Sequence, residues 1–219
     1  MDIEINNIYN IDCLTGMKNM PKDSVDFTLT DIPYAEANRT SNGLRNLDKE
    51  EADILTFELH EFLEEVYRVT KNSICIFCGM KQFSTIYSFF AEKKGTVRTV
   101  VYHKTNPAPL NGQCVYLSGI ELAVWFKKRG AKTFNAFCKN TVLKHPAGKR
   151  DIHPTQKNPN LFKELILDNT NEGDVVFDPC LGSGTTAVVC IENNRKYIGF
   201  ELKEEYFSKA LERVEGIKK

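Results

Sequence analysis

The chain has no long hydrophobic run, and its 219 residues include only one Trp and four His. No stretch approaches the roughly 18 consecutive apolar residues that can cross a bilayer, so we do not expect a membrane protein. The first ten residues carry acids instead of bases and lack an apolar core, so we expect no signal peptide. His145 and His153 are isolated, and we predict no metal site.

The cysteines show no sign of pairing. There are seven, an odd number, scattered along the chain, which indicates free thiols in a reducing, cytoplasmic setting. Cys75 and Cys78 have the spacing of a zinc or redox pair, but they lie in an apolar extended segment. Residues three apart in a strand point to opposite faces, so we interpret both as core residues.

Acidic residues are nearly absent from the middle of the chain. Residues 93–150 contain twelve Lys and Arg and a single acid, Glu121, although the whole chain has a formal net charge of zero. A local charge of +11 in a neutral protein favours a surface for a polyanion, most commonly nucleic acid. A solvated basic face is the alternative.

Short apolar segments alternate with amphipathic ones, which predicts an α/β domain. We expect strands at 25–30, 73–78, 97–102, 119–126, 174–178 and 196–201. We expect helices at 51–70, 80–94, 160–168, 185–193 and 203–214, with irregular segments at 105–118 and 129–155.

A glycine-containing turn follows the expected strand at 174–178. Gly182 and Gly184 allow a ligand close to the backbone, and the helix that starts next offers unpaired N–H groups. Glu201 ends the following strand, 19 residues after Gly182, where a carboxylate can accept hydrogen bonds from ribose hydroxyls. This combination predicts an adenosine-containing cofactor; a tight turn beside a surface Glu is the alternative.

The spacing Gly182-x-Gly184-x-x-Ala187 also fits a dinucleotide fingerprint, so a nicotinamide-dependent oxidoreductase must be considered. Only 18 residues follow Glu201, so the other strands must come from earlier in the chain, unlike the usual order of such a domain. Asp178 would also repel a pyrophosphate, whereas it would attract a sulfonium or an ammonium.

The tetrapeptide Asp31-Ile32-Pro33-Tyr34 ends the strand at 25–30, where open α/β sheets bind their ligands. The Asp31 carboxylate and the Ile32 carbonyl can accept the two N–H bonds of a base amine, turning its lone pair toward a methyl donor. Tyr34 offers a flat face for a base removed from the stack. Alone, the tetrapeptide could equally be a turn at a strand end.

Together these motifs resemble the N4/N6 amino-methyltransferases of DNA, in the permuted beta-class order. The supporting segments are Asn10-Ile11-Asp12-Cys13-Leu14, Asp31-Ile32-Pro33-Tyr34, His153-Pro154-Thr155-Gln156-Lys157, Asp178 to Thr186, and Tyr197-Ile198-Gly199-Phe200-Glu201. The resemblance implies a Rossmann-like methyltransferase fold with a mostly parallel, seven-stranded twisted sheet flanked by helices. It also implies S-adenosyl-L-methionine as the cofactor.

The resemblance assigns roles to residues at matching positions. It implies that Asp31, Ile32, Pro33 and Tyr34 are catalytic. The implied cofactor-binding residues are Asp12, Cys13, Asp31, Thr155, Gln156, Lys157, Asp178, Pro179, Gly182, Ser183, Gly184, Thr185 and Glu201. The chain departs from the family pattern at Ile32, which replaces a proline, and at Asn158, where Pro159 comes one place late. Cys180 resembles the nucleophile of cytosine-C5 enzymes, but amino methylation needs no covalent intermediate.

We expect one domain, residues 1–219. It comprises a catalytic half (1–104), a basic target-recognition segment (105–150) and a cofactor-binding half (151–219). The expected DNA-contacting residues are Arg39, Arg45, Lys104, Lys127, Lys128, Arg129, Lys132, Lys144, Lys149 and Arg150. The segment is short for a recognition domain, which leaves open a homodimer, a cognate restriction endonuclease or another recognition subunit.

The sequence therefore predicts a cytoplasmic, bacterial or phage-encoded enzyme that methylates adenine N6 in a flipped-out base of double-stranded DNA. Asp at position 31 favours adenine over cytosine N4 by resemblance to the family. The alternatives are the same reaction at cytosine N4, an oxidoreductase, and a non-catalytic DNA-binding relative. Duplex RNA is a further candidate substrate, because charge alone does not distinguish it from DNA.

Overall fold

The computed structural model describes residues 2–34, 56–109, 112–148 and 157–218. Its strands are β1 (Asn7–Asn10), β2 (Val25–Asp31), β3 (Thr70–Cys78), β4 (Gly95–Lys104), β5 (Ile120–Lys128), β6 (Val142–His145), β7 (Val175–Asp178) and β8 (Lys196–Glu201). Its helices are α1 (Cys13–Lys18), α2 (Leu59–Val69), α3 (Met80–Ala91), α4 (Pro159–Asn169), α5 (Thr185–Glu192) and α6 (Glu204–Lys218).

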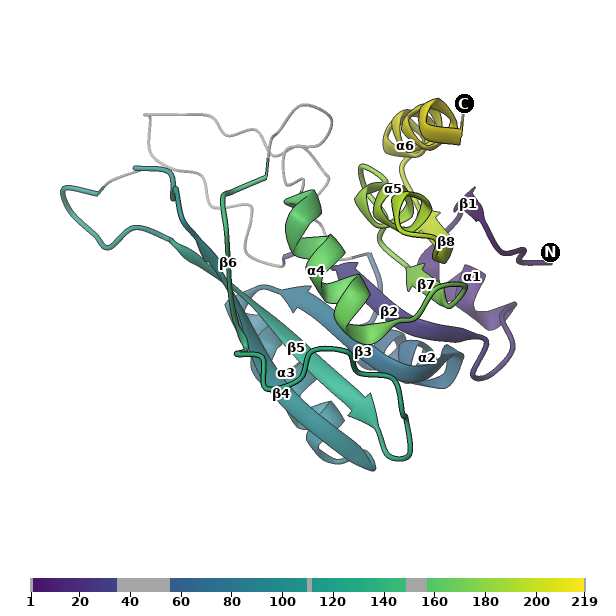
Figure 1. Cartoon of the computed structure of the whole chain (residues 1–219), viewed down its shortest axis with the longest axis horizontal. Helices are drawn as coiled ribbons and strands as arrows, with labels where there is room; N and C mark the ends of the chain where they lie inside the picture. The colour runs from purple at the N-terminus through teal and green to yellow at the C-terminus, as the bar shows by residue number, and fades with distance from the viewer. Residues whose placement is uncertain (1, 35–55, 110–111, 149–156, 219) are drawn as a thin grey trace.

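The described strands form one sheet in the order β1-β8-β7-β2-β3-β5-β4-β6 (Figure 1). Strands β1, β8, β7, β2 and β3 run parallel to one another, β5 is antiparallel to β3 and β4, and β6 is parallel to β4. Strands β7 and β8, from the end of the chain, lie between β1 and β2, from its beginning. The permuted motif order thus gives one continuous sheet.

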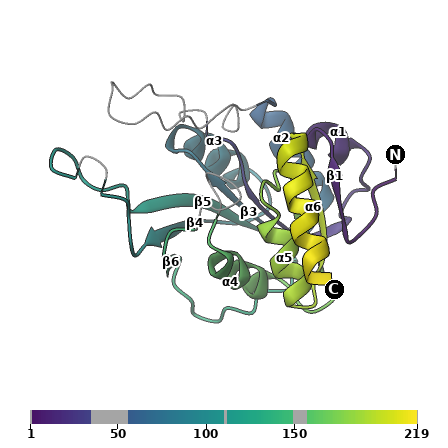
Figure 2. The same ribbon diagram turned by 90° about the horizontal axis from the view of Figure 1, so that it is seen from above.

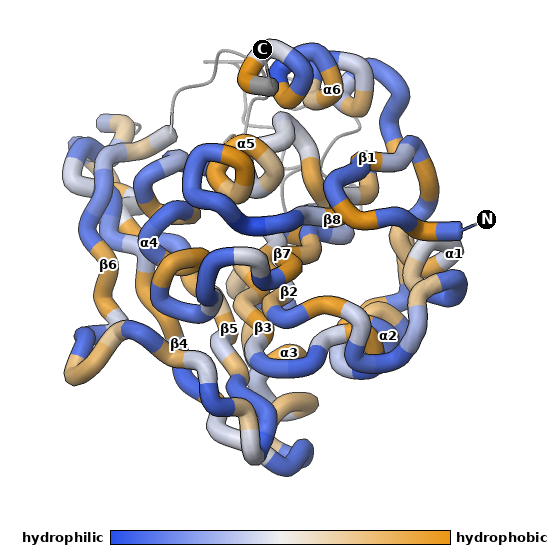
Figure 3. The backbone as a smooth tube through the Cα atoms, turned by 45° about the vertical axis from the view of Figure 1, so that its right-hand side comes forward, coloured by the Kyte–Doolittle hydropathy of each residue, from blue (hydrophilic) through white to orange (hydrophobic). Residues whose placement is uncertain are grey.

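Helices cover both faces of the sheet (Figure 2). Side chains of α1, α2 and α3, including Met17, Phe62 and Phe90, pack on one face. On the other face α4 and α5 pack against β2, β3 and β7, and α6 lies beside α5. The hydropathy colouring of Figure 3 shows apolar residues concentrated in the central strands and α5. The sheet therefore separates two hydrophobic cores.

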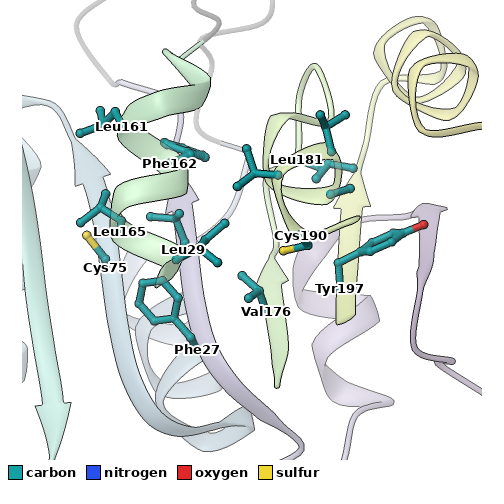
Figure 4. Packing of buried hydrophobic residues seen from close by; sticks show 14 of the residues in the cluster. Phe27, Leu29, Cys75, Leu161, Phe162, Leu165, Val176, Leu181, Cys190 and Tyr197 are labelled. Atoms are coloured by element: carbon teal, nitrogen blue, oxygen red, sulfur yellow. The ribbon is translucent and has the colours of Figure 1, made fainter. Parts of the chain in front are cut away.

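Alternate residues of β3 show why the sheet needs helices on both faces. Cys75 and Phe77 lie in the core beneath α4, while Ile76 and Cys78 lie in the core beneath α2 and α3. Figure 4 shows Cys75 beside Leu165 of α4. Both cysteines of the Cys75-x-x-Cys78 pair are buried free thiols on opposite faces, which confirms their interpretation as core residues.

The α/β class and the mostly parallel sheet are confirmed, with one correction: the described sheet has eight strands instead of seven. The segment 129–155, expected to be irregular, contributes β6. This strand has only four residues, so it shows no clear periodicity. Leu143 packs into the core, and the Tyr102 hydroxyl donates to the Pro146 carbonyl at 2.5 Å.

Other boundaries shift modestly. The helix expected at 51–70 begins at Leu59 within the described residues, because the Glu58 carboxylate accepts from the Glu61 N–H at 2.7 Å and caps it. Residues 51–55 lie outside the described ranges. Across the described part of the chain, no helix combines the length and hydrophobicity needed to traverse a membrane.

Candidate active site at the carboxyl edge of the sheet

Four carboxylates lie at or just after the carboxyl ends of four neighbouring parallel strands. Asp12 follows β1, Glu201 ends β8, Asp178 ends β7, and Asp31 ends β2. Open α/β sheets bind ligands at this edge. The two halves of the sequence-predicted site, far apart in the chain, are therefore brought together. Asp31 and Asp178 lie close enough for their charges to interact.

The turn after β7 is shaped for a close backbone approach. Gly182 and Gly184 adopt positive φ angles of 54° and 77°, a region that disfavours side chains. A Cβ on Gly184 would lie 3.1 Å from the Ala210 Cβ of α6. The Leu181 N–H donates to the Phe200 carbonyl at 2.8 Å, which fixes the turn against β8. Both glycines are therefore required by the conformation of the turn.

Glu201 joins the glycine turn to β8. One carboxylate oxygen accepts from the Gly182 N–H at 2.8 Å and the other from the Lys203 N–H at 2.9 Å. Burial raises the pKa of Glu201, while these backbone donors oppose the shift. The carboxylate is placed at the turn, and its role as the ribose ligand stays a prediction.

Asp178 is almost fully buried under the same turn. Its oxygens accept from the Thr186 hydroxyl at 2.5 Å and the Cys180 N–H at 3.1 Å. Burial raises its pKa to about 7, with a smaller contribution from the Asp31 charge. Asp178 therefore joins the turn to the first residues of α5, because one of its oxygens has a partner in each.

Several other predicted cofactor residues have structural partners. Asp12 caps α1, accepting from the Thr15 N–H at 2.9 Å. Ser183 and Thr185 are buried and their hydroxyls lie 3.1 Å apart. Pro179 is buried in the turn. These residues lie at the carboxyl edge of the sheet, as expected from the sequence. Their contacts with a cofactor stay predictions.

Cys180 is poorly suited to act as a nucleophile. It lies beside Cys13, and this contact together with burial raises the pKa of its thiol well above the usual range. The thiolate, not the thiol, is the attacking species. The structure therefore disfavours covalent chemistry at Cys180.

The catalytic tetrapeptide forms a network with Lys157. The Tyr34 hydroxyl donates to Asp31 at 3.0 Å, and Lys157 Nζ lies 2.9 Å from the other Asp31 oxygen. Lys157 also donates to the Tyr34 oxygen at 3.0 Å and lies 5.3 Å from the centre of its ring. Burial raises the pKa of Asp31 to about 6, and the Lys157 charge opposes that rise.

The backbone after Asp31 is fixed by contacts with β3 and α3. The Ile32 N–H donates to the Phe77 carbonyl at 3.2 Å, and the Ile32 side chain is 1% exposed. Buried Gln82 accepts from the Gly79 N–H at 2.9 Å and donates to the Pro33 carbonyl at 2.9 Å. The backbone at Ile32 is therefore held by its hydrogen bond to β3 and by burial of its side chain, without a proline at this position.

Comparison with known proteins identifies the family. The family model N6_N4_Mtase, described as DNA methylase, matches residues 25–212, which include Asp31, Lys157 and Glu201. The chain belongs to this family of DNA methylases.

Individual relatives match over nearly the whole chain. The type II methyltransferase M.HpaI of Haemophilus parainfluenzae is 32% identical, covering 93% of this chain and 72% of the relative. The DNA adenine methyltransferase YhdJ of Escherichia coli (strain K12) is 27% identical, covering 97% and 83%. The crystal structure of the M1.HpyAVI-SAM complex has a TM-score of 0.73 at 31% identity, covering 94% of this chain and 98% of the other.

The basic residues of the methylase divide between two edges of the sheet. Lys104 and Lys144 lie toward the Asp31 edge, because β4 and β6 end there. Four others are not brought to this edge, since β5 is antiparallel to β3 and ends at the opposite side. These four are Lys127, Lys128, Arg129 and Lys132. Lys128 is partnered by Asp23 at 3.0 Å.

Some predicted site residues of the methylase lie outside the described ranges. These are Arg39, Arg45, Lys149, Arg150, Thr155 and Gln156. Among the described residues, no group of three His, Cys, Asp or Glu side chains is arranged to hold a metal ion.

Sequence reasoning did not assign Glu121 or Gln82 to the site. Glu121 carried a signal, because it is the single acid in a basic segment and has two lysine partners here. Gln82 carried no such signal in the sequence, because its role depends on the close approach of α3 to the tetrapeptide.

Proposed function

We propose that this methylase transfers the methyl group of S-adenosyl-L-methionine to the exocyclic N6 amine of adenine in double-stranded DNA. The observation that carries the proposal is the adjacency of Asp31 and Tyr34, at the end of β2, to the Asp178 turn at the end of neighbouring β7. Amine acceptor and cofactor turn thus occupy one edge of the sheet.

The residues at this edge suit S-adenosyl-L-methionine. Gly182 and Gly184 leave the turn free of side chains, and Glu201 lies where ribose hydroxyls can donate to it. The Asp31 and Asp178 carboxyl groups favour a sulfonium over a pyrophosphate. This cofactor supplies an electrophilic methyl group. A complex of M1.HpyAVI, 31% identical to this chain, contains it.

The chain's own groups prepare the amine. Asp31 accepts one amine N–H bond and the Ile32 carbonyl accepts the other, which directs the nitrogen lone pair toward the methyl donor. Tyr34 stacks on a base flipped out of the duplex. Fixing both reactants in this way can contribute on the order of 7–11 kcal/mol to lowering the barrier in favourable cases.

Adenine is favoured over cytosine by two observations. Asp stands at position 31 in the catalytic tetrapeptide, and the relative YhdJ is named a DNA adenine methyltransferase. Purified protein with methyl-labelled S-adenosyl-L-methionine and unmethylated duplex DNA should label adenine N6. Label at cytosine N4 would show that cytosine is the target base. In a parallel reaction with duplex RNA, label in the RNA but not in the DNA would exclude DNA as the substrate.

We also propose which residues contact DNA, which partner completes recognition and where the protein is located. Lys104 and Lys144 are proposed to contact DNA phosphates beside the site, and a homodimer or cognate restriction endonuclease is proposed to complete recognition. Light scattering of the protein with and without DNA tests the dimer, and co-purification tests the endonuclease. Free thiols throughout the described residues support a reducing, cytoplasmic location.

A further inference from the structure

Glu121 reaches the active-site edge because of the direction of β5. This strand is antiparallel to β3, so its beginning lies beside the end of β3, with Leu122 opposite Cys78. The Glu121 carboxylate therefore lies among groups from β2, β4 and the segment before α4, although its own strand contributes no residue to the catalytic tetrapeptide.

Charges alternate along a chain of partly buried side chains. Lys104 Nζ lies 2.5 Å from one Glu121 oxygen, and Lys157 Nζ lies 2.6 Å from the other. Lys157 then pairs with Asp31 at 2.9 Å. Two positive and two negative groups balance, which reduces the cost of burying them.

The hydrogen-bonding capacity of Lys157 is fully used. Its three N–H donors go to Glu121, Asp31 and the Tyr34 oxygen. Each Asp31 oxygen accepts one of these neighbours, so each keeps a lone pair for an incoming amine. Lys157 is thus committed to the catalytic tetrapeptide, while Asp31 is still able to accept.

We propose that Glu121 is a positioning residue for the methyl transfer. It holds the Lys157 ammonium against Asp31 and Tyr34, which fixes the acceptor carboxylate and the stacking ring in one arrangement. Glu121 acts through Lys157 and does not touch the substrate. The inference rests on the proposed function, because it assumes that Asp31 accepts the amine.

The charges around Asp31 determine the direction in which its pKa should change when Glu121 is replaced. The groups facing it are Lys157, Glu121, Tyr34, Cys78 and Asp178. Burial raises the pKa of Cys78 to about 12, so this thiol stays neutral. The Glu121 charge raises the pKa of Asp31. The Lys157 charge lowers that pKa by more than the Glu121 charge raises it, so release of Lys157 from Asp31 should make Asp31 ionise at higher pH.

The test compares Glu121→Gln with the wild-type chain. Loss of the Lys157 anchor should lower kcat by about 10- to 100-fold, the scale expected when a catalytic group is misplaced by about 1 Å. The KM for S-adenosyl-L-methionine should stay unchanged. The acid limb of kcat/KM should move to higher pH if Lys157 is released, whereas a shift to lower pH would show that only the Glu121 charge was lost and would contradict the positioning role. A raised KM with an unchanged kcat would instead place Lys157 on the cofactor and overturn the proposal.

Glu164→Gln is the matched control. Glu164 is also a partly buried acid with two basic partners, Lys139 at 2.8 Å and His145, but it lies on α4 away from the tetrapeptide. This substitution should leave kcat and the pH profile as in wild type. If both variants behave alike, Glu121 has only a structural role.

Glu121→Asp provides a second readout if Glu121→Gln does not fold. It keeps the negative charge but shortens the side chain by one methylene group, so the carboxylate withdraws from Lys157 and kcat should fall by less than about 10-fold. A wild-type kcat in Glu121→Asp would show that the contact with Lys157 is not needed and would contradict the inference. Absence of DNA methylation by the wild-type chain would instead contradict the proposed function, and the two failures are therefore distinguishable.

Discussion

At the scale of single residues, the site depends on Asp31 being an acceptor. Its oxygens face Tyr34 and Lys157, and it ends a strand beside the cofactor turn. The sequence could predict this residue because a carboxylate before an x-Pro-Tyr turn has a readable chemistry. It could not predict the Lys157 contact, which joins residues 126 positions apart.

Replacing Asp31 by Asn tests its role with little change in volume. The amide keeps one carbonyl acceptor but loses the ion pair with Lys157, so we expect kcat to fall by about 100-fold or more, as for other lost positioning contacts. Cofactor binding, measured by calorimetry, should persist because the glycine turn is intact. Unchanged kcat would exclude Asp31 from the reaction.

The same residue predicts a pH dependence. Burial raises the Asp31 pKa to about 6, so the carboxyl group is protonated below that pH and a poor acceptor. The value of kcat/KM should therefore rise as pH increases through about 6. The measurement is a steady-state profile from pH 5 to 8. A flat acid side in the wild-type chain would show that another group or step governs the rate.

At the scale of elements, local signals predicted the site better than they predicted its surroundings. The strand, glycine turn and helix at β7–α5 were predictable, because Gly182 and Gly184 mark positive φ angles. Strands β1 and β6 were missed because each has four residues of which only one is buried, whereas all four residues of β7 are buried. The sequence gives charge but not strand direction, so it could not predict that the basic end of β5 lies at the edge opposite to Asp31. Contact of these residues with DNA stays a prediction.

Gly184→Ala tests the glycine turn. A side chain there is strained at φ 77° and meets the Ala210 Cβ at 3.1 Å. We expect the free energy of unfolding to fall by about 1–2 kcal/mol from the left-handed conformation alone. Steric crowding against Ala210 should lower it further. Gly173→Ala is the matched control: φ is 82° and no atom lies within 4 Å of the added Cβ. If urea unfolding gave the same decrease in the free energy of unfolding for both variants, the contact with α6 would be unimportant.

At the scale of the whole molecule, the order of strands explains how a permuted sequence forms one site. Strands β7 and β8 insert between β1 and β2, so the chain's first and last parts share the carboxyl edge. The family motifs predicted this arrangement. The distribution of basic residues did not, because only Lys104 and Lys144, among the predicted DNA-contacting residues that the structure describes, lie toward that edge.

The most direct measurement is base-resolved sequencing of DNA from cells that express the wild-type chain or Asp31→Asn, with modified adenines and cytosines distinguished. The wild-type chain should produce N6-methyladenine within a short recurring sequence, and the variant, at equal expression, should methylate a much smaller fraction of those sites. Modified cytosine in place of adenine, or adenine methylation in the variant at the wild-type level, would contradict the assignment of Asp31 as the amine acceptor of an adenine methylase.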